Sequence, residues 1–377
     1  MELKKFDNRI WLSSPTMHGE EQAFVQEAFD TNWVSTVGEN LNQLEKGICD
    51  YVGCQHGVAL ASGTSAIHMA LKMAGVKQGD KVFCSSLTFA ATANPITYEK
   101  AEPVFIDSEY DTWNMDPEAL ERAFQLYPGT KVVIVVNLYG TPAKLDEIKE
   151  ICHRHGAVLI EDAAESLGAT YKGKQTGNFG QFNAISFNGN KIITTSGGGM
   201  FLTDDKKAAE HVRKLSTQAR EPFPWYQHEE IGHNYRMSNI VAGIGRGQLL
   251  HLDEHVAKKK GIYQRYEAGL ADLPLTMNPY MADMEPNFWL SCFLLEEDCK
   301  VTPEEIRVKL AEYNAEARPV WKPMHMQPVF AGCAFVGKDE HTNVCADLFE
   351  RGLCLPSDIK MTAEEQDMVI EIIKSCF

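Results

Sequence analysis

The sequence lacks the patterns of secreted and membrane-spanning proteins. Its 10 cysteines are scattered with no CxxC pair, so no disulfide framework is indicated and reduced thiols are expected. No segment approaches the ~20 apolar residues of a membrane span, and the amino terminus has no apolar core of signal-peptide length. These absences predict a soluble, cytoplasmic protein.

Clusters of basic residues are also missing. The formal net charge is −16, which disfavours a nucleic-acid or anionic-membrane partner, because such partners need grouped Lys and Arg. Any anionic substrate must then be bound by local positive groups.

No paired metal-ligand motif is present. Cys152, His153 and His155 lie close together and could be considered as ligands. They fall at the end of an expected helix, residues 144–155, where histidines suit the negative end of the helix dipole. Because no second ligand pair accompanies them, the sequence predicts no metal site.

Strand and helix signals alternate along the first two thirds of the chain. With 377 residues and 44% hydrophobic content, the chain is long enough for about two domains with a full core. Short strands are expected near 57–60, 81–85, 103–106, 132–136, 158–160, 184–187 and 200–203. Helices are expected at 17–31, 40–51, 65–74, 90–99, 117–124, from 144 onward, and at 204–216. This alternation predicts an α/β protein with a mostly parallel sheet covered by helices on both faces.

The last third has a different pattern. Residues 218–239 are rich in Pro, aromatic and polar residues without a clear period, as in long functional or intersubunit connections. One long helix is expected over 239–270, followed by a strand at 289–294, helices at 303–313, 342–351 and 363–375, and a turn at 317–328. We expect a large domain at residues 1–250 and a small C-terminal α+β domain at 251–377.

Two expected strands end in an acid and an amine. The apolar run Val158–Ile160 breaks into Glu161 and Asp162, and the strand ending at Phe187 is followed by Lys191, alone among small and neutral residues. Open α/β sheets bind ligands at the carboxyl ends of their strands. The pair suits pyridoxal phosphate, in which a lysine forms the Schiff base and an acid keeps the ring nitrogen protonated. Taken alone, a surface lysine and a helix-capping aspartate explain the same residues.

A Ser-Gly-Thr-Ser turn, residues 62–65, precedes the expected third helix. Free backbone N–H groups at such a turn can bind a phosphate, although Ser62, Thr64 and Ser65 could equally be helix N-caps. Phe89 is expected near the carboxyl edge of the sheet, where it could stack on a planar cofactor or belong to the core.

Six motifs occur in a fixed order along the chain: SGTSAIHMAL, TFAATANP, FIDSEYDTWNMD, IEDAAESLGATYKGKQTG, SFNGNKIITTSGGG and GHNYRMSN. In these motifs the chain resembles the sugar aminotransferases of the DegT/DnrJ/EryC1/StrS family, from about Trp11 to the C-terminus. The resemblance is strongest to enzymes that transaminate UDP-4-keto-6-deoxy-N-acetylglucosamine in bacillosamine and exopolysaccharide biosynthesis. It implies a fold type I enzyme that uses pyridoxal 5'-phosphate and forms a homodimer with shared active sites.

The resemblance also implies roles for individual residues. Lys191 and Asp162 are the implied catalytic pair, and Asn234 is expected to reach the cofactor phosphate of the neighbouring subunit. The other implied cofactor contacts are Gly63, Thr64, Ser65, Phe89, Glu165 and Ser186. The implied substrate contacts are Asn188, Arg236, Arg318, Trp321, Lys322 and His325. Many relatives carry histidine at the position of Glu165, which leaves its contact with substrate open. Lysine at 191 separates this chain from related dehydratases that carry histidine there.

The expected reaction has two halves. Glutamate gives its amino group to the cofactor, and the C4 ketone of the nucleotide sugar then receives it, with Lys191 moving the protons. A GDP- or dTDP-linked ketosugar is the alternative substrate. A non-catalytic sensor that binds pyridoxal phosphate is the alternative class, and it would never convert the cofactor to the amino form with any donor.

Overall fold

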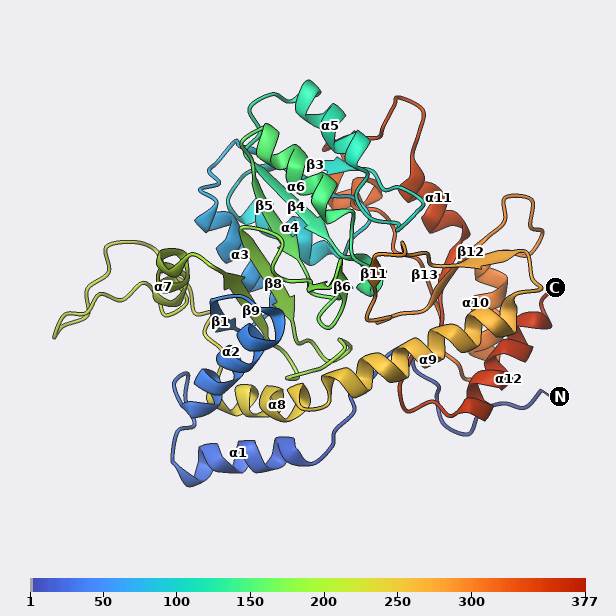
Figure 1. The fold of residues 1–377 in the computed structure, drawn as a ribbon, viewed down its shortest axis with the longest axis horizontal. Helices are drawn as coiled ribbons and strands as arrows, with labels where there is room; N and C mark the ends of the chain where they lie inside the picture. Colours follow the sequence, from blue (N-terminus) through green and yellow to red (C-terminus); the bar gives the residue numbers. More distant parts are fainter. Residues whose placement is uncertain (1–2) are drawn as a thin grey trace.

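A computed structural model describes residues 3–377, and its centre is an eight-stranded sheet in the order β1-β9-β8-β5-β4-β2-β3-β14 (Figure 1). Neighbouring strands from β8 to β14 run parallel, whereas β9 is antiparallel to β8 and β1. The strands are β1 (His56–Leu60), β2 (Lys81–Ser85), β3 (Glu102–Ile106), β4 (Val132–Val136), β5 (Val158–Asp162), β8 (Phe182–Ser186), β9 (Gly199–Thr203) and β14 (Ala334–Val336). The predicted α/β fold with a mostly parallel sheet is confirmed.

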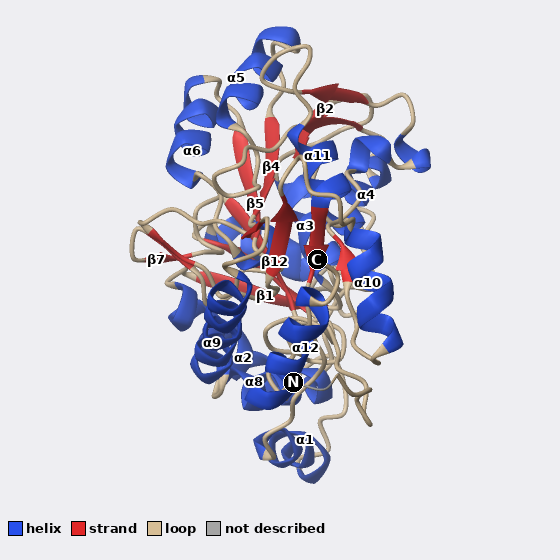
Figure 2. Ribbon diagram, turned by 90° about the vertical axis from the view of Figure 1, so that its right-hand side faces the viewer, coloured by secondary structure: helices blue, strands red, loops and turns tan. Residues whose placement is uncertain are grey.

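Helices cover both faces of this sheet, and Figure 2 shows its strands between α6 on one side and α4 on the other. The helices of this part are α1 (Glu20–Asp30), α2 (Glu39–Val52), α3 (Gly63–Met73), α4 (Ala90–Tyr98), α5 (Pro117–Leu126), α6 (Leu145–Arg154) and α7 (Lys206–Leu215). In β4, Val132 and Ile134 share a core with α3, α4 and α7. Val133 and Val135 pack with α5 and α6 on the opposite face. Because both faces are covered, β4 is apolar at every position.

The C-terminal part contains a second sheet in the order β10-β12-β15-β13. Its elements are β10 (Leu275–Met277), β12 (Cys292–Leu295), α10 (Pro303–Glu312), β13 (Arg318–Pro319), α11 (Val344–Arg351), β15 (Gly352–Cys354) and α12 (Ala363–Lys374). A small third sheet joins β6 (Thr170–Tyr171), β7 (Lys174–Gln175) and β11 (Met284–Glu285). Apart from β12, the strands of these two sheets were not predicted, because two or three residues carry too little periodic signal.

Two segments cross the expected boundary between residues 250 and 251. β14 pairs with β3 in the large sheet, with Ala334 opposite Val104. Near the other end of the chain, Ile10 bridges to Ala315, and both belong to the core of the C-terminal part. The expected division into residues 1–250 and 251–377 stays a prediction. In these two places, a segment from one part of the chain pairs with the other part.

The single helix predicted over residues 239–270 is wrong. The chain forms α8 (Asn239–Leu249) and α9 (Leu252–Leu270), and the direction changes between them (Figure 1). α8 packs closely on α1: a Cβ added at Gly247 would lie 2.6 Å from the backbone nitrogen of Glu21. The break lets α8 keep this contact while α9 crosses toward the C-terminal part.

None of the helices among residues 3–377 combines the length and apolarity needed to cross a membrane.

Two other predicted elements begin later than expected. α1 begins at Glu20, because Gly19 has a left-handed φ of 116° that ends any helix running from Met17. β12 begins at Cys292, so Trp289 lies in the preceding loop.

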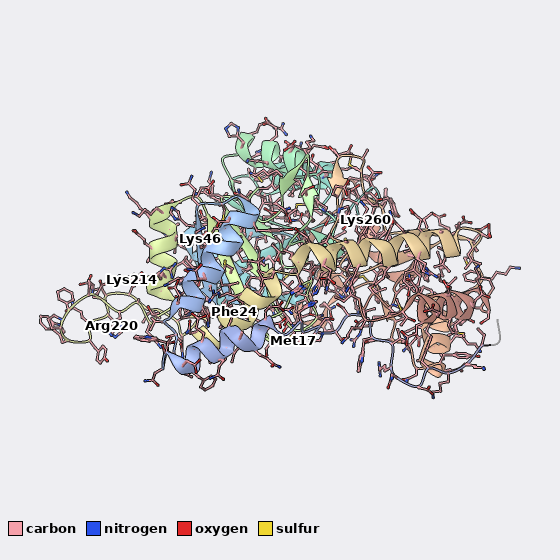
Figure 3. The ribbon with its side chains drawn as sticks, turned by 60° about the horizontal axis from the view of Figure 1, so that its bottom comes forward. Met17, Phe24, Lys46, Lys214, Arg220 and Lys260 are labelled. Atoms are coloured by element: carbon pink, nitrogen blue, oxygen red, sulfur yellow. The ribbon has the colours of Figure 1, made fainter. Side chains whose placement is uncertain are left out.

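The connection between α7 and α8 projects from the body of the protein (Figure 1). Figure 3 shows Arg220 on this projection, beyond Lys214 at the end of α7. Three of its aromatic side chains are exposed, namely Phe223, Trp225 and Tyr226. A long irregular connection was predicted here from the sequence. The exposed aromatic side chains at its tip are among the aromatic residues noted in that segment.

Candidate active site

Lys191 lies in the loop after β8, at the carboxyl edge of the parallel strands. Its backbone N–H donates to the Asn188 carbonyl over 3.0 Å. Its Nζ is 3.6 Å from Glu165 Oε1 and 3.9 Å from the centroid of the Trp289 ring. The Trp289 ring is held in place by its Nε1–H, which donates to the Asn190 carbonyl over 2.6 Å. The amine is therefore positioned between a carboxylate and an aromatic face.

Asp162 ends β5, which is the neighbour of β8 in the sheet, and its side chain is buried. Its Oδ2 accepts from the Thr92 hydroxyl over 2.6 Å, and its Oδ1 accepts from the Ala164 N–H over 3.1 Å. Burial raises the pKa of Asp162, although these hydrogen bonds and the charge of Lys191 act in the opposite direction. A cationic ring N–H beside this carboxylate would supply the counter-charge that burial makes necessary.

Glu165 follows β5 and contacts the same amine. Its Oε2 accepts from the Tyr139 backbone N–H over 2.7 Å. Burial raises its pKa to about 7, against the opposing charge of Lys191. A carboxyl group that titrates near neutral pH therefore lies beside the amine.

A cradle for an anion lies at the start of α3. The Ser62 hydroxyl caps this helix by accepting from the Ser65 N–H over 3.0 Å. Gly63 approaches β8 so closely that an added Cβ would lie 2.9 Å from Ser186 Cβ. This approach brings the Ser186 hydroxyl next to the first turn of α3, where backbone N–H groups have no partner within the helix and the dipole favours negative charge.

The protein also has a cavity of about 790 Å³ that is lined by the loop after β2 and by the C-terminal part. Its lining includes Thr88 and Phe89 from the turn between β2 and α4, and Trp321 from the C-terminal part. Phe89 is 58% exposed, and its ring centroid is 5.6 Å from that of Trp321. Neither Lys191 nor Asp162 lines the cavity itself. The link is Thr88, whose hydroxyl lies 2.6 Å from that of Thr92, the partner of Asp162.

The cavity also has a cationic wall. Its positively charged lining residues are Arg9, Arg307, Arg318 and Lys322. Glu316 lies among them and accepts from Arg318. In a chain with a formal net charge of −16, such a local excess of positive charge favours an anionic ligand.

Four predicted substrate or phosphate contacts, namely the side chains of Asn188, Asn234, Arg236 and His325, belong neither to the cavity lining nor to the contacts described above for Lys191, Asp162, Glu165 and the start of α3. The Arg236 guanidinium donates to Glu45 over 2.5 Å and to the Ala59 carbonyl over 2.9 Å, and it is 8% exposed. His325 contacts the Ser86 hydroxyl over 2.7 Å and stacks on Phe335. Both therefore have internal partners. Asn188 and Asn234 are exposed, and Asn234 lies on the projecting connection. The predicted contacts of these four residues with ligands stay predictions.

Three residues of this site were missed in the sequence. Thr92 was counted within a helix, Trp289 was assigned to a strand, and Tyr139 was not considered. The buried Tyr139 hydroxyl accepts from the Trp321 backbone N–H over 2.9 Å, which joins the cavity wall to the loop that holds Glu165. A signal for Tyr139 existed, because the polar sequence NLYG directly follows the apolar strand VVIVV.

These residues fit pyridoxal phosphate. The anion cradle suits its phosphate, the buried Asp162 suits its ring nitrogen, and the exposed Phe89 ring offers a stacking surface. An α/β fold with this arrangement around a lysine is typical of an enzyme that depends on pyridoxal phosphate.

Comparison with known proteins narrows the class to one family. Residues 15–374 match the DegT/DnrJ/EryC1/StrS aminotransferase family, and the chain belongs to it. It is 52% identical over 374 residues to EpsN of Bacillus subtilis (strain 168), which covers 98% of this chain and 96% of that protein. It is 38% identical over 364 residues to a GDP-perosamine synthase of Caulobacter vibrioides, which covers 96% of both.

Solved structures agree with this assignment. A DegT DnrJ EryC1 StrS aminotransferase from Brucella abortus superposes with a TM-score of 0.87 at 28% identity, over 94% of this chain and 95% of that one. A sugar aminotransferase from Streptococcus pneumoniae, Spr1654 in its PLP form, gives a TM-score of 0.87 at 25% identity, over 97% of both chains. The protein is a sugar aminotransferase that uses pyridoxal phosphate, and the family predicted from the six motifs is confirmed.

Proposed function

We propose that the enzyme transfers the amino group of L-glutamate to the C4 ketone of a nucleotide-linked 4-keto-6-deoxy sugar, with UDP-4-keto-6-deoxy-N-acetylglucosamine as the substrate. The observation that carries this proposal is the cationic cavity, which is connected to Asp162 through the hydroxyl groups of Thr88 and Thr92. Arg318 and Lys322 would bind the diphosphate of the nucleotide, and Trp321 would contact its apolar parts.

The cofactor, when bound, supplies an electron sink that stabilises the carbanion formed next to nitrogen. Lys191 would hold it covalently and, once released, its amine would move the proton between carbon atoms. Glu165 lies 3.6 Å from this amine and titrates near neutral pH, so it can exchange a proton with it. Asp162 would keep the ring nitrogen charged. The first turn of α3 and Ser186 would bind its phosphate, and Phe89 would stack on its ring.

Replacement of Lys191 tests the catalytic assignment. Lys191→Ala should abolish turnover and the absorption band of the covalently bound cofactor, because the change removes the amine that lies between Glu165 and the Trp289 ring. Lys46→Ala is the matched control: its amine pairs with Asp50 at the surface and is 68% exposed. Retained activity in Lys191→Ala would contradict the proposal.

The identity of the sugar needs a separate test. Relatives named GDP-perosamine synthase are 38%, 33% and 29% identical to this chain, which makes a GDP-linked ketosugar the second candidate. A panel of UDP-, GDP- and dTDP-linked 4-keto-6-deoxy sugars should be assayed with glutamate, with formation of 2-oxoglutarate and the amino sugar as readouts. We expect the highest kcat/KM with the UDP sugar, and a higher value with the GDP sugar would replace our assignment.

We also propose a homodimer in which Asn234 completes the neighbouring subunit's phosphate site. Support comes from its exposure on a projecting connection whose tip carries exposed aromatic side chains. Asn234→Asp should be inactive, because it places a carboxylate against a phosphate. Mixing it with Lys191→Ala should restore about a quarter of wild-type activity, since about half of the dimers are then mixed and each has one intact site. No recovery after confirmed subunit exchange would contradict a shared site.

A further inference from the structure

Three histidines from two separate segments of the chain lie close together beside the Lys191 loop. His18 lies just before α1, whereas His251 and His255 lie at the start of α9. The Nε2 atoms of His18 and His255 are 2.7 Å apart, and the His18 ring stacks on His251 with centroids 3.7 Å apart. Figure 3 shows Met17, the neighbour of His18, at the end of α1 near the junction of α8 and α9.

The proton on His255 is fixed by its other contact. Its Nδ1 lies 2.8 Å from the Ile192 carbonyl, and a carbonyl can only accept, so Nδ1 carries the proton. The lone pair on Nε2 therefore points toward His18. Histidines that bind metal ions are oriented in this way, with the second ring nitrogen donating to a backbone carbonyl.

Carboxylates surround the remaining histidine. His251 Nδ1 lies 3.3 Å from Glu254 and its Nε2 lies 3.2 Å from Glu20. The available ligand atoms of His18, His251 and Glu254 all lie within 4.8 Å of one another. Lys258 also faces the group and pairs with Glu254 over 2.7 Å.

The local sequence has the matching order. Residues 251–255 read HLDEH, which places two histidines four positions apart with a glutamate directly before the second. Histidines four apart lie on one side of a helix, and the H-x-x-E-H order occurs in helical zinc sites.

We propose that His18, His251, His255 and Glu254 bind a divalent cation of the Zn²⁺ or Co²⁺ class, at a site distinct from the cofactor and sugar sites. Imidazole and carboxylate ligands suit these ions, whereas Mg²⁺ and Ca²⁺ prefer all-oxygen sites. Binding requires the side chains to close to about 2.0–2.2 Å from the ion and the Lys258 pair to open. Glu254 and Glu20 balance the added charge. The ion would fasten the segment before α1 to α9 and, through His255, to the Lys191 loop.

A Co²⁺ titration of the holoenzyme tests this site, with absorption followed at wavelengths beyond the cofactor bands. We expect one Co²⁺ per chain, displaced by Zn²⁺ and not by Mg²⁺. His251→Gln and Glu254→Gln should each raise the dissociation constant at least about tenfold. The matched control is His153→Gln, since His153 is exposed at the end of α6 and should leave the titration unchanged. No Co²⁺ spectrum, or equal affinity in His251→Gln and His153→Gln, would overturn the site.

Thermal unfolding gives an independent measurement. Zn²⁺ should raise the melting temperature of the wild type and of His153→Gln, because an ion that binds only the folded state stabilises it. The rise should be absent in His18→Gln, a change in a half-buried loop residue. An equal rise in all three proteins would show non-specific binding and overturn the proposal.

Discussion

The hydrogen bond from Thr92 to Asp162 gives a quantitative test of the cofactor site. Thr92 is the hydrogen-bond donor found for Asp162 Oδ2, at 2.6 Å in a buried environment. Thr92→Val preserves the shape of the side chain and removes its hydroxyl, which donates to Asp162 and also bonds the Thr88 hydroxyl. A hydrogen bond to a charged group contributes about 1.5–3 kcal/mol. The ionised carboxylate is needed when the charged ring nitrogen is bound, so the dissociation constant of pyridoxal phosphate should rise about 10- to 150-fold.

The assay is a titration of the cofactor-free protein with pyridoxal phosphate, followed by absorption and by quenching of tryptophan fluorescence. Thr97→Val is the matched control, because its hydroxyl donates to the Asn94 carbonyl within the same helix, at an exposed position. Thr92→Val also leaves the buried Thr88 hydroxyl without its partner, so the unfolding of Thr92→Val in urea must be measured in parallel. A Thr92→Val protein that binds the cofactor within twofold of the control would refute the role given to Asp162.

Three further outcomes follow from the same contacts. In the cofactor-free wild type, burial raises the pKa of Glu165 from 4.5 to about 7, so the folded state binds more protons than the unfolded state between these values. The free energy of unfolding of the wild type should therefore fall by up to about 3 kcal/mol as the pH rises from 4.5 to 7. Glu165→Gln should lack this fall when the two proteins are compared by urea unfolding at several pH values. Gly63→Ala should cost about 1–3 kcal/mol in urea unfolding and weaken cofactor binding, since its Cβ would meet Ser186 at 2.9 Å; unchanged values would refute the close approach. Trp289→Phe keeps the aromatic face and removes the donor to the Asn190 carbonyl, so stability should fall by about 0.5–1.5 kcal/mol, and an equally stable variant would show that this bond contributes nothing.

Much of the large sheet could be predicted from the sequence. β4 and β5 are apolar runs buried on both faces, and a polar residue at the end of β5 marks the edge where ligands bind. The pair Asp162 and Lys191 was found from this rule alone, although only the order of six motifs separated it from a helix cap and a surface amine.

Other parts of the site depend on contacts between distant segments. Trp289 contacts the Lys191 amine from a loop nearly 100 positions away, and nothing in its local pattern distinguishes it from a strand residue. Arg236 was placed on the sugar side by resemblance, while the structure pairs it with Glu45 on α2. The break between α8 and α9 also has no marker, because Leu250 and His251 are compatible with a continuous helix and the direction changes to satisfy packing on α1.

The pairing of β14 with β3 has a consequence for how the chain can move and be divided. A short strand from the C-terminal third forms one edge of the central sheet. Backbone hydrogen bonds therefore join the C-terminal part to the large sheet, and the two cannot rotate as rigid bodies about a simple hinge. A fragment of residues 1–250 would expose the backbone donors and acceptors of β3, and unpaired edges of this kind recruit strands from other molecules. Such a fragment should aggregate, and the whole chain should unfold in one cooperative transition.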